Sequence, residues 1–189
     1  MTSFGEAAGR RSASSESYTR SMRPVRPDLA LLWPSYTLFP LIGLGILVVG
    51  VTGSDSTMVL IGLALLAFNA LTLLNYASFT QVGIEGDELV HRTFFGSHVE
   101  RVPIGSLQRV DAKRYPGAHS GVSAPFLVAR GRDATVKVNT KPYRLRDLAS
   151  LLELVRRANS RVELDPFWER AVRGEDVSKE IALTPRSRW

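Results

Sequence analysis

Two long apolar segments decide the fold of this chain: residues 29–51, LALLWPSYTLFPLIGLGILVVGV, and residues 57–79, TMVLIGLALLAFNALTLLNYASF. Each segment has 23 residues, and neither contains a charged side chain. At about 1.5 Å of rise per residue, a helix of that length crosses a hydrocarbon core of roughly 30 Å. Because only the short polar turn 52–56 separates them, we expect two antiparallel membrane-spanning helices.

A secretory signal peptide is the rival interpretation of the first apolar segment. Signal peptides have shorter apolar cores, of about 7–15 residues, and are not normally followed at once by a second segment of the same kind. The sequence therefore favours a hairpin of two spans.

The basic residues are distributed unevenly around these spans. The chain has 24 Lys and Arg, of which five precede the first segment, 19 follow the second and none lies in the turn between them. Basic residues are enriched in the cytoplasmic flanks of membrane proteins. We therefore expect a multi-pass protein of the cell membrane, with both termini in the cytoplasm and the loop that carries Asp55 outside.

Composition excludes some functions. The formal net charge of +6 could suggest a nucleic-acid partner, but no nucleic-acid-binding motif accompanies it, and cytoplasmic flanks explain it more simply. The chain has no cysteine, which excludes disulfides, zinc–thiolate sites and thiol catalysis.

Small and polar residues inside the spans predict helix–helix contacts. Gly43, Gly45 and Gly50 allow close approach of a second helix, and the amide of Asn69 requires a partner at mid-span. A polar transport path is the alternative. Since neither span contains an ionisable group, which ion and proton pathways normally require, we expect no transporter mechanism.

After the second span the pattern changes to alternating polar and apolar residues, which is typical of strands. Turn signals separate the expected strands at 79–84, 88–95, 98–104, 107–115, 125–130 and 134–140. A stripe of leucines at spacings of three and four then predicts one amphipathic helix over 144–159. The fold class expected is therefore a membrane α-hairpin plus an α+β, mainly β, soluble domain: a curved antiparallel sheet or small barrel capped by a C-terminal helix.

Three segments carry a family resemblance: VGIEGDELVHRT (82–93), VPIGSLQRVDAKR (102–114) and PYRLRDLASLLELVRRA (142–158). With the two spans before them, they resemble the bacterial pleckstrin-homology (PH)-like membrane proteins, over about residues 30–158. The resemblance implies a PH-like cytoplasmic domain. Pro103, Ile104, Leu107 and Val110 match the family's pattern, whereas Gly105 stands where the family often has Trp.

Basic residues of the expected sheet suggest an anion-binding patch. With a turn centred on residues 96–97, Arg92 would lie opposite Arg101, and like charges directly opposite on a sheet repel. Either this register is wrong, or an anion relieves the repulsion. With Lys113 and Arg114 on a neighbouring strand, the four residues are a candidate patch for anionic lipid head groups or an acidic partner. The alternative is a solvated basic surface.

The sequence offers no catalytic, cofactor-binding or metal-binding residues, and we expect no enzyme. His91 and His98 could share a face with Glu100, but exposed strand histidines are commoner than metal ligands. Nucleophile-elbow and phosphate-cradling glycine motifs do not occur in the sequence.

The last segment, residues 161–189, predicts a short helix, with Asp165 as its cap, Pro166 in its first turn and Gly174 at its end. Phe167 and Trp168 would dock on the domain or dip into the membrane interface.

These patterns divide the chain into a disordered basic tail (1–27), a membrane hairpin (28–79), a PH-like cytoplasmic domain (80–160) and a C-terminal tail (161–189). The function expected is a non-enzymatic, membrane-anchored interaction module that binds a partner protein or anionic lipid head groups. The alternative is an accessory or scaffold subunit of a larger membrane complex, with a transporter component less favoured. Homo-oligomers fit either function, and no nucleic acid is expected.

Overall fold

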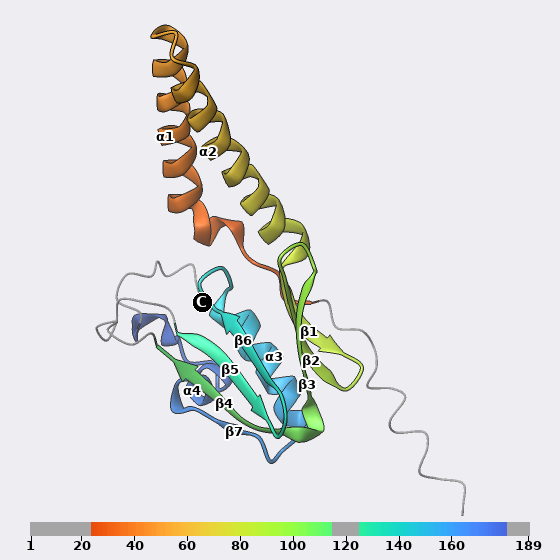
Figure 1. The fold of residues 1–189 in the computed structure, drawn as a ribbon. Helices are drawn as coiled ribbons and strands as arrows, with labels where there is room; N and C mark the ends of the chain where they lie inside the picture. Colours follow the sequence, from red (N-terminus) through yellow and green to blue (C-terminus); the bar gives the residue numbers. More distant parts are fainter. Residues whose placement is uncertain (1–23, 115–124, 181–189) are drawn as a thin grey trace, which may run out of the picture.

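The computed structural model describes residues 24–114 and 125–180, and its class is α+β (Figure 1). The helical elements are η2 (Leu29–Leu32), α1 (Trp33–Thr52), α2 (Ser56–Leu74), the π-helical turn η3 (Asn75–Phe79), η4 (Ile104–Ser106), α3 (Leu145–Ala158), α4 (Pro166–Val172) and η5 (Val177–Glu180). The strands are β1 (Gln81–Glu85), β2 (Glu88–Thr93), β3 (His98–Pro103), β4 (Leu107–Lys113), β5 (Phe126–Gly131), β6 (Thr135–Asn139) and β7 (Glu163–Leu164).

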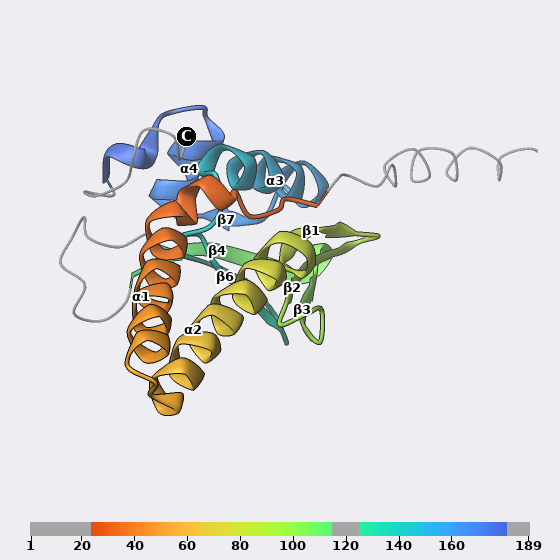
Figure 2. The same ribbon diagram turned by 90° about the horizontal axis from the view of Figure 1, so that it is seen from above.

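Helices α1 and α2 form an antiparallel pair that projects from one end of the β-rich part (Figure 1). The turn between them is closed by Asp55, whose carboxylate accepts hydrogen bonds from the backbone N–H groups of Thr57 and Met58. Helix α1 meets the domain beside α3, whereas α2 continues through η3 into β1 (Figure 2). Both helices lie within a few residues of the expected segments.

The strands form two sheets. One is antiparallel in the order β1-β2-β3, and the other has the order β6-β5-β4-β7, in which only β7 pairs in parallel. The six predicted strands are confirmed. The seventh, β7, was not predicted, because its two residues are too few for a periodic pattern.

The predicted register between β2 and β3 is wrong. Thr93 pairs with His98, so Arg92 lies opposite Val99 and Arg101 lies opposite Val90. The turn contains the four residues 94–97 rather than two. The predicted Arg92–Arg101 repulsion therefore does not exist.

Helix α3 packs its leucine stripe onto the sheets, as its sequence predicted. Leu145, Leu148, Leu152 and Val155 are fully buried in one core with strand residues such as Val102 and Val136. This single apolar cluster joins both sheets to the helix.

The same core continues beyond residue 160, the expected end of the domain. Val162, Phe167, Trp168, Ala171 and Val177 belong to it, and the indole Nε1 of Trp168 donates to the carbonyl of Asp111 at 3.3 Å. Phe167 and Trp168 therefore dock on the domain.

The short helix expected in the last segment is confirmed as α4. The carboxylate of Asp165 accepts a hydrogen bond from the N–H of Phe167, Pro166 lies in the first turn, and Gly174 follows with a φ of +86°.

The chain before the hairpin also contacts the domain. Val25 pairs with Val82 of β1 through two backbone hydrogen bonds of 2.7 and 3.0 Å. Val25, which was expected in the disordered tail, is therefore paired with the domain, and residues 1–23 lie outside the described part of the chain.

Candidate functional site

The helical hairpin exposes a continuous apolar surface. Phe68, Leu60 and Leu41 are 70%, 67% and 59% exposed, and most of the other large apolar side chains of both helices are exposed as well. By length and composition, one helix in the described residues, Ser56–Phe79, is suited to cross a membrane; the apolar stretch of α1, Tyr36–Thr52, is shorter. This surface requires an apolar cover, whether lipid or protein.

Backbone contacts hold the two helices together near their turn. A Cβ atom added at Gly50 would lie 2.6 Å from the backbone nitrogen of Val59, and one added at Gly62 would lie 2.7 Å from that of Leu47. Gly45, in contrast, faces open space, so it makes no close contact within this helix pair, and a contact in an oligomer stays a prediction.

Two further residues of α1 and α2 were expected at helix–helix contacts. A Cβ atom on Gly43 would meet Leu65 and Leu66 at 3.3 Å. Asn69 is buried, while Phe68 and Ala70 on either side of it are exposed. Gly43, like Gly50 and Gly62, therefore lies at the contact between α1 and α2.

A strap of residues 24–28 ties the start of the hairpin to the domain. Besides the Val25–Val82 pairing, the N–H of Asp28 donates to the carbonyl of Pro142 at 2.7 Å. Nε of Arg144 donates to Oδ2 of Asp28 at 2.6 Å, and this hydrogen bond lowers the pKa of the Asp28 carboxyl group below its ordinary value. The start of the hairpin is therefore fixed to the domain both by backbone hydrogen bonds and by an ion pair.

The other end of the hairpin is held through Asn75. Its side-chain Oδ1 accepts from the N–H of Phe95 at 2.6 Å, and its carbonyl accepts from both the N–H and the hydroxyl of Thr80. The rings of Phe79 and Phe95 lie 5.3 Å apart. Both ends of the hairpin are thus fixed to the same domain.

A tyrosine lies buried where the hairpin meets the domain. Tyr143 is 1% exposed, and its hydroxyl has no hydrogen-bond partner among the described residues. Burial raises the pKa of this hydroxyl far above its ordinary value, with a smaller contribution from Tyr76. Nearby, the rings of Tyr36 and Tyr76 meet edge to face at 6.4 Å.

The four residues of the candidate basic patch lie in two places. Arg92 and Arg101 belong to the β1-β2-β3 sheet, and each is neutralised by a carboxylate: Arg92 donates to Glu85 at 2.7 Å, and Arg101 donates to Glu88 at 3.3 Å. The hydrogen bond from Arg92 also lowers the pKa of Glu85. Intramolecular pairing leaves these two arginines less available to an external anion.

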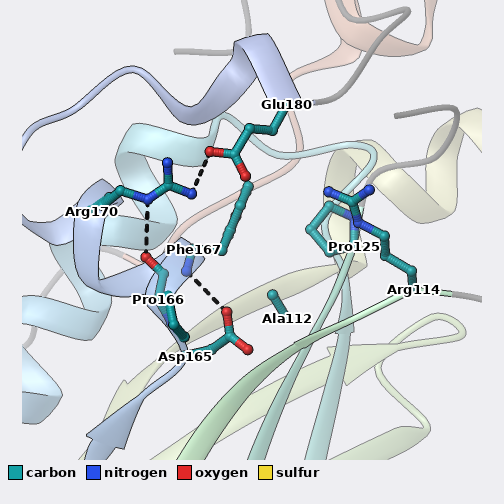
Figure 3. Close-up of a pocket in the computed structure, with 8 residues that line it drawn as sticks. All are labelled: Ala112, Arg114, Pro125, Asp165, Pro166, Phe167, Arg170 and Glu180. Carbon is teal, nitrogen blue, oxygen red and sulfur yellow. Dashed lines mark hydrogen bonds and ion pairs between the residues drawn. The ribbon is translucent and has the colours of Figure 1, made fainter. Parts of the chain in front are cut away.

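Lys113 and Arg114 lie at the end of β4, in and just after the other sheet. They form no ion pair with another described residue. Arg114 lines an open cavity of about 230 Å³ that Phe167 of α4, Arg170 and Glu180 also border (Figure 3). Arg170 is paired with Glu180 there, whereas Arg114 has no ion-pair partner among the residues that the structure describes.

Two arginines do lie directly opposite each other, but on β4 and β5 rather than on β2 and β3. Arg109 of β4 lies directly opposite Arg130 of β5. Asp111 lies between them, 2.5 Å from Nε of Arg109 and 3.1 Å from Nε of Arg130. A carboxylate of the chain supplies the compensating charge, and the Arg-x-Asp pattern of β4 was the only signal of it in the sequence.

The histidines lie as expected on one face of the sheet. His91 Nδ1 and His98 Nε2 are 3.7 and 3.6 Å from opposite oxygens of Glu100, which also accepts a hydrogen bond from the N–H of Lys137. Burial lowers the pKa of His91. Within 24–114 and 125–180, no group of three or more His, Asp or Glu side chains is arranged to hold a metal ion. Glu100 instead links β3 to β6. His119 lies outside the described residues.

Comparison of the chain with protein-family models, with curated proteins and with solved structures gives no significant match. The class that the fold defines is thus an α+β domain that carries a projecting apolar helical pair.

Proposed function

We propose that this protein is a non-enzymatic, membrane-anchored interaction module. The hairpin spans the cell membrane with both termini in the cytoplasm. The domain lies at the cytoplasmic face and binds a partner protein or anionic lipid head groups. The main support for this proposal is the exposed, uncharged surface of the two helices. The start and the end of the hairpin are both fixed to the domain, and the helix pair projects from there.

Exposure of so many large apolar side chains to water would be strongly unfavourable, at roughly 25 cal/mol for each Å² of apolar surface. A bilayer removes that cost. Apart from the position of Pro40 in α1, which has no N–H to donate, the backbone groups inside each helix bond to one another, as a hydrocarbon environment requires. The turn contains Asp55 and no basic residue, so it is the part more easily translocated to the outside.

The domain supports a PH-like fold by its order of elements. Two antiparallel three-stranded meanders, β1-β2-β3 and β4-β5-β6, lie in separate sheets, and the amphipathic helix α3 follows and closes the core. Anchoring such a domain raises its local concentration at the membrane, so that even weak contacts become effective.

Fractionation of cells tests the anchor. We expect the full chain to sediment with membranes, to resist extraction by high salt and by alkaline carbonate, and to be released by detergent. Recovery in the carbonate supernatant would contradict the proposal, since peripheral proteins are released there.

Among the four candidate residues, Lys113 and Arg114 are the better choice for a lipid contact, because Arg92 and Arg101 are already paired with carboxylates. A basic residue close to an anionic membrane contributes about 1 kcal/mol. The full chain should be compared in nanodiscs of phosphatidylcholine with and without phosphatidylglycerol. Hydrogen exchange of β4 should slow with the anionic lipid, and Lys113→Ala with Arg114→Ala should abolish the difference, whereas Arg92→Ala with Arg101→Ala should preserve it. No effect of the anionic lipid in the wild type would leave a protein partner as the ligand.

The alternative, an accessory subunit of a membrane complex, is favoured by one observation. Gly45 faces outward from the helix pair with open space before it, where a further helix could approach closely. Extraction in mild detergent followed by size analysis separates the two functions, because a subunit co-migrates with other chains. Gly45→Leu should disrupt that co-migration and leave the chain folded.

A further inference from the structure

The turn between β2 and β3 has an unusual composition for its backbone. Phe94, Phe95 and Gly96 all have positive φ, at 48°, 56° and 79°. Glycine adopts this left-handed conformation without strain, but for a bulky residue it is a true outlier. Such outliers persist only where the surrounding structure imposes them, and they concentrate at functional positions.

Specific contacts impose this turn conformation. The N–H groups of Gly96 and Ser97 donate to the carbonyls of Thr93 and Phe94, both at 3.0 Å. The hydroxyl of Ser97 donates to the same Phe94 carbonyl at 2.6 Å.

A second set of contacts attaches the turn to the end of α2. The side chain of Asn75 accepts from the N–H of Phe95, and the ring of Phe95 lies against that of Phe79. The turn is therefore locked at a fixed height along the hairpin, where the apolar span Ser56–Phe79 ends (Figure 1).

The fixed turn displays its aromatic rings rather than burying them. Phe94 is 68% and Phe95 48% exposed, and Phe79 beside them is 38% exposed. The ring of Phe95, against Phe79, extends the apolar surface of the hairpin onto the domain. The ring of Phe94 follows in the same turn, where it meets His98 edge to face at 6.3 Å. In the proposed orientation they lie at the level where the hydrocarbon ends, and aromatic rings are favoured at that interface.

We infer that the β2–β3 turn is a second membrane contact, in which Phe94 and Phe95 insert into the lipid interface beside the end of α2 and fix the tilt of the domain. This inference rests on the proposed function, since it requires the hairpin to lie in a bilayer. Its occupant is the head-group and upper acyl region of the cytoplasmic leaflet.

The absence of cysteine allows a direct test by single spin labels in the full chain. Labels are placed at Phe94→Cys, at Phe68→Cys on the exposed side of α2, and at Asp87→Cys in the exposed β1–β2 turn of the same sheet. Each protein is reconstituted in vesicles of phosphatidylcholine and phosphatidylglycerol. Relaxation of the label by oxygen, which partitions into lipid, is compared with relaxation by a water-soluble nickel chelate.

We expect the labels at residues 68 and 94 to favour oxygen and the label at residue 87 to favour the chelate. A label at residue 94 as accessible to the chelate as that at residue 87 would overturn the inference. So would a label shielded from both reagents, which indicates a protein contact. If the label at residue 68 were also in water, the hairpin itself would lie outside the bilayer, and the proposed function would fail first.

A second variant keeps both phenylalanines and removes the lock. Asn75→Ala takes away the acceptor for the Phe95 N–H, so the label at residue 94 should lose part of its preference for oxygen while the label at residue 68 keeps its own. An unchanged ratio at residue 94 would contradict the role assigned to Asn75 in placing the turn.

Discussion

Nε of Arg144, at the start of α3, donates a 2.6 Å hydrogen bond to Oδ2 of Asp28, 116 residues earlier in the chain. Asp28 directly precedes the hairpin, and its backbone N–H is bonded to Pro142 in the same loop. The hairpin and the domain are therefore joined at two points: by these hydrogen bonds of Asp28 at the start of the hairpin, and by the direct continuation of α2 through η3 into β1 at its end.

This clamp predicts the behaviour of Asp28→Asn. Asparagine still accepts from the N–H of Ala30 but loses its charge attraction to Arg144, so the strap should open more often. We expect hydrogen exchange at the amides of Val25 and Val82 to accelerate several-fold. Glu153→Gln is the matched control, because it removes an exposed ion pair with Arg157 that is remote from the strap. Equal exchange in Asp28→Asn and the wild type would show that the backbone pairing alone holds the strap.

The close contact between α1 and α2 predicts different effects of a leucine at Gly62, which faces α1, and at Gly45, which does not face α2. Leucine at Gly62 would meet the backbone of Leu47 and force the helices apart, whereas leucine at Gly45 would enter open space. Cysteines at Gly43 and Leu66, whose positions are in contact, report the distance by their rate of disulfide formation. We expect Gly62→Leu to slow this cross-link and Gly45→Leu to leave it unchanged. Equal rates in both variants would contradict the packing described.

Burial of His91 predicts that the domain loses stability as the pH falls from neutral. Above about pH 6.5 the histidine is neutral in both the folded and the unfolded chain. Below that pH the unfolded chain binds a proton, but the folded chain does not until the lowered pKa is reached, so the unfolded state gains. Asp28 and Glu85 have lowered pKa values too, but their contributions are lost only at more acidic pH.

Thermal unfolding of the full chain in detergent, between about pH 7.5 and about pH 5.5, measures this dependence. His91→Gln should flatten the curve, whereas His98→Gln, at an exposed position beside the same Glu100, should retain the slope. If the melting temperature of His91→Gln still fell with pH as in the wild type, the pH dependence would come from another group.

The hydroxyl of Tyr143 has no hydrogen-bond partner among the described residues, which predicts that its removal is harmless. Loss of a buried polar atom of this kind in Tyr143→Phe should be nearly neutral or stabilising. Tyr143→Ala leaves a cavity and should cost roughly 3–5 kcal/mol, as for other large aromatic residues. The melting temperatures of both variants, compared with that of the wild type, test this prediction. A strongly lowered melting temperature in Tyr143→Phe would mean that the hydroxyl has an essential partner.

Sequence patterns were sufficient where the structure is local. The six strands and the leucine stripe of α3 repeat with their own periods, and Asp165, Pro166 and Gly174 mark a helix by their individual chemistry. None of these features depends on what lies opposite in space.

The features that were not predicted are long-range. The β2–β3 register depends on a turn in which Phe95 is held by Asn75, 20 residues away, and nothing in the turn sequence indicates that contact. The same applies to the pairing of Val25 with Val82. The Arg92–Arg101 half of the candidate patch was built on the mistaken register. The pairing of Arg92 with Glu85 of β1 was missed as well, because it depends on how two side chains reach along the sheet.

In the proposed topology the hairpin crosses the bilayer twice and the domain stays inside the cell. Single cysteines at Ser54, in the turn between the helices, and at Asp87, in the domain, test it with a membrane-impermeant thiol reagent. We expect Ser54→Cys to be labelled in intact cells and Asp87→Cys to be labelled only after the membrane is opened. Labelling of Asp87→Cys in intact cells, or of Ser54→Cys only after lysis, would contradict it.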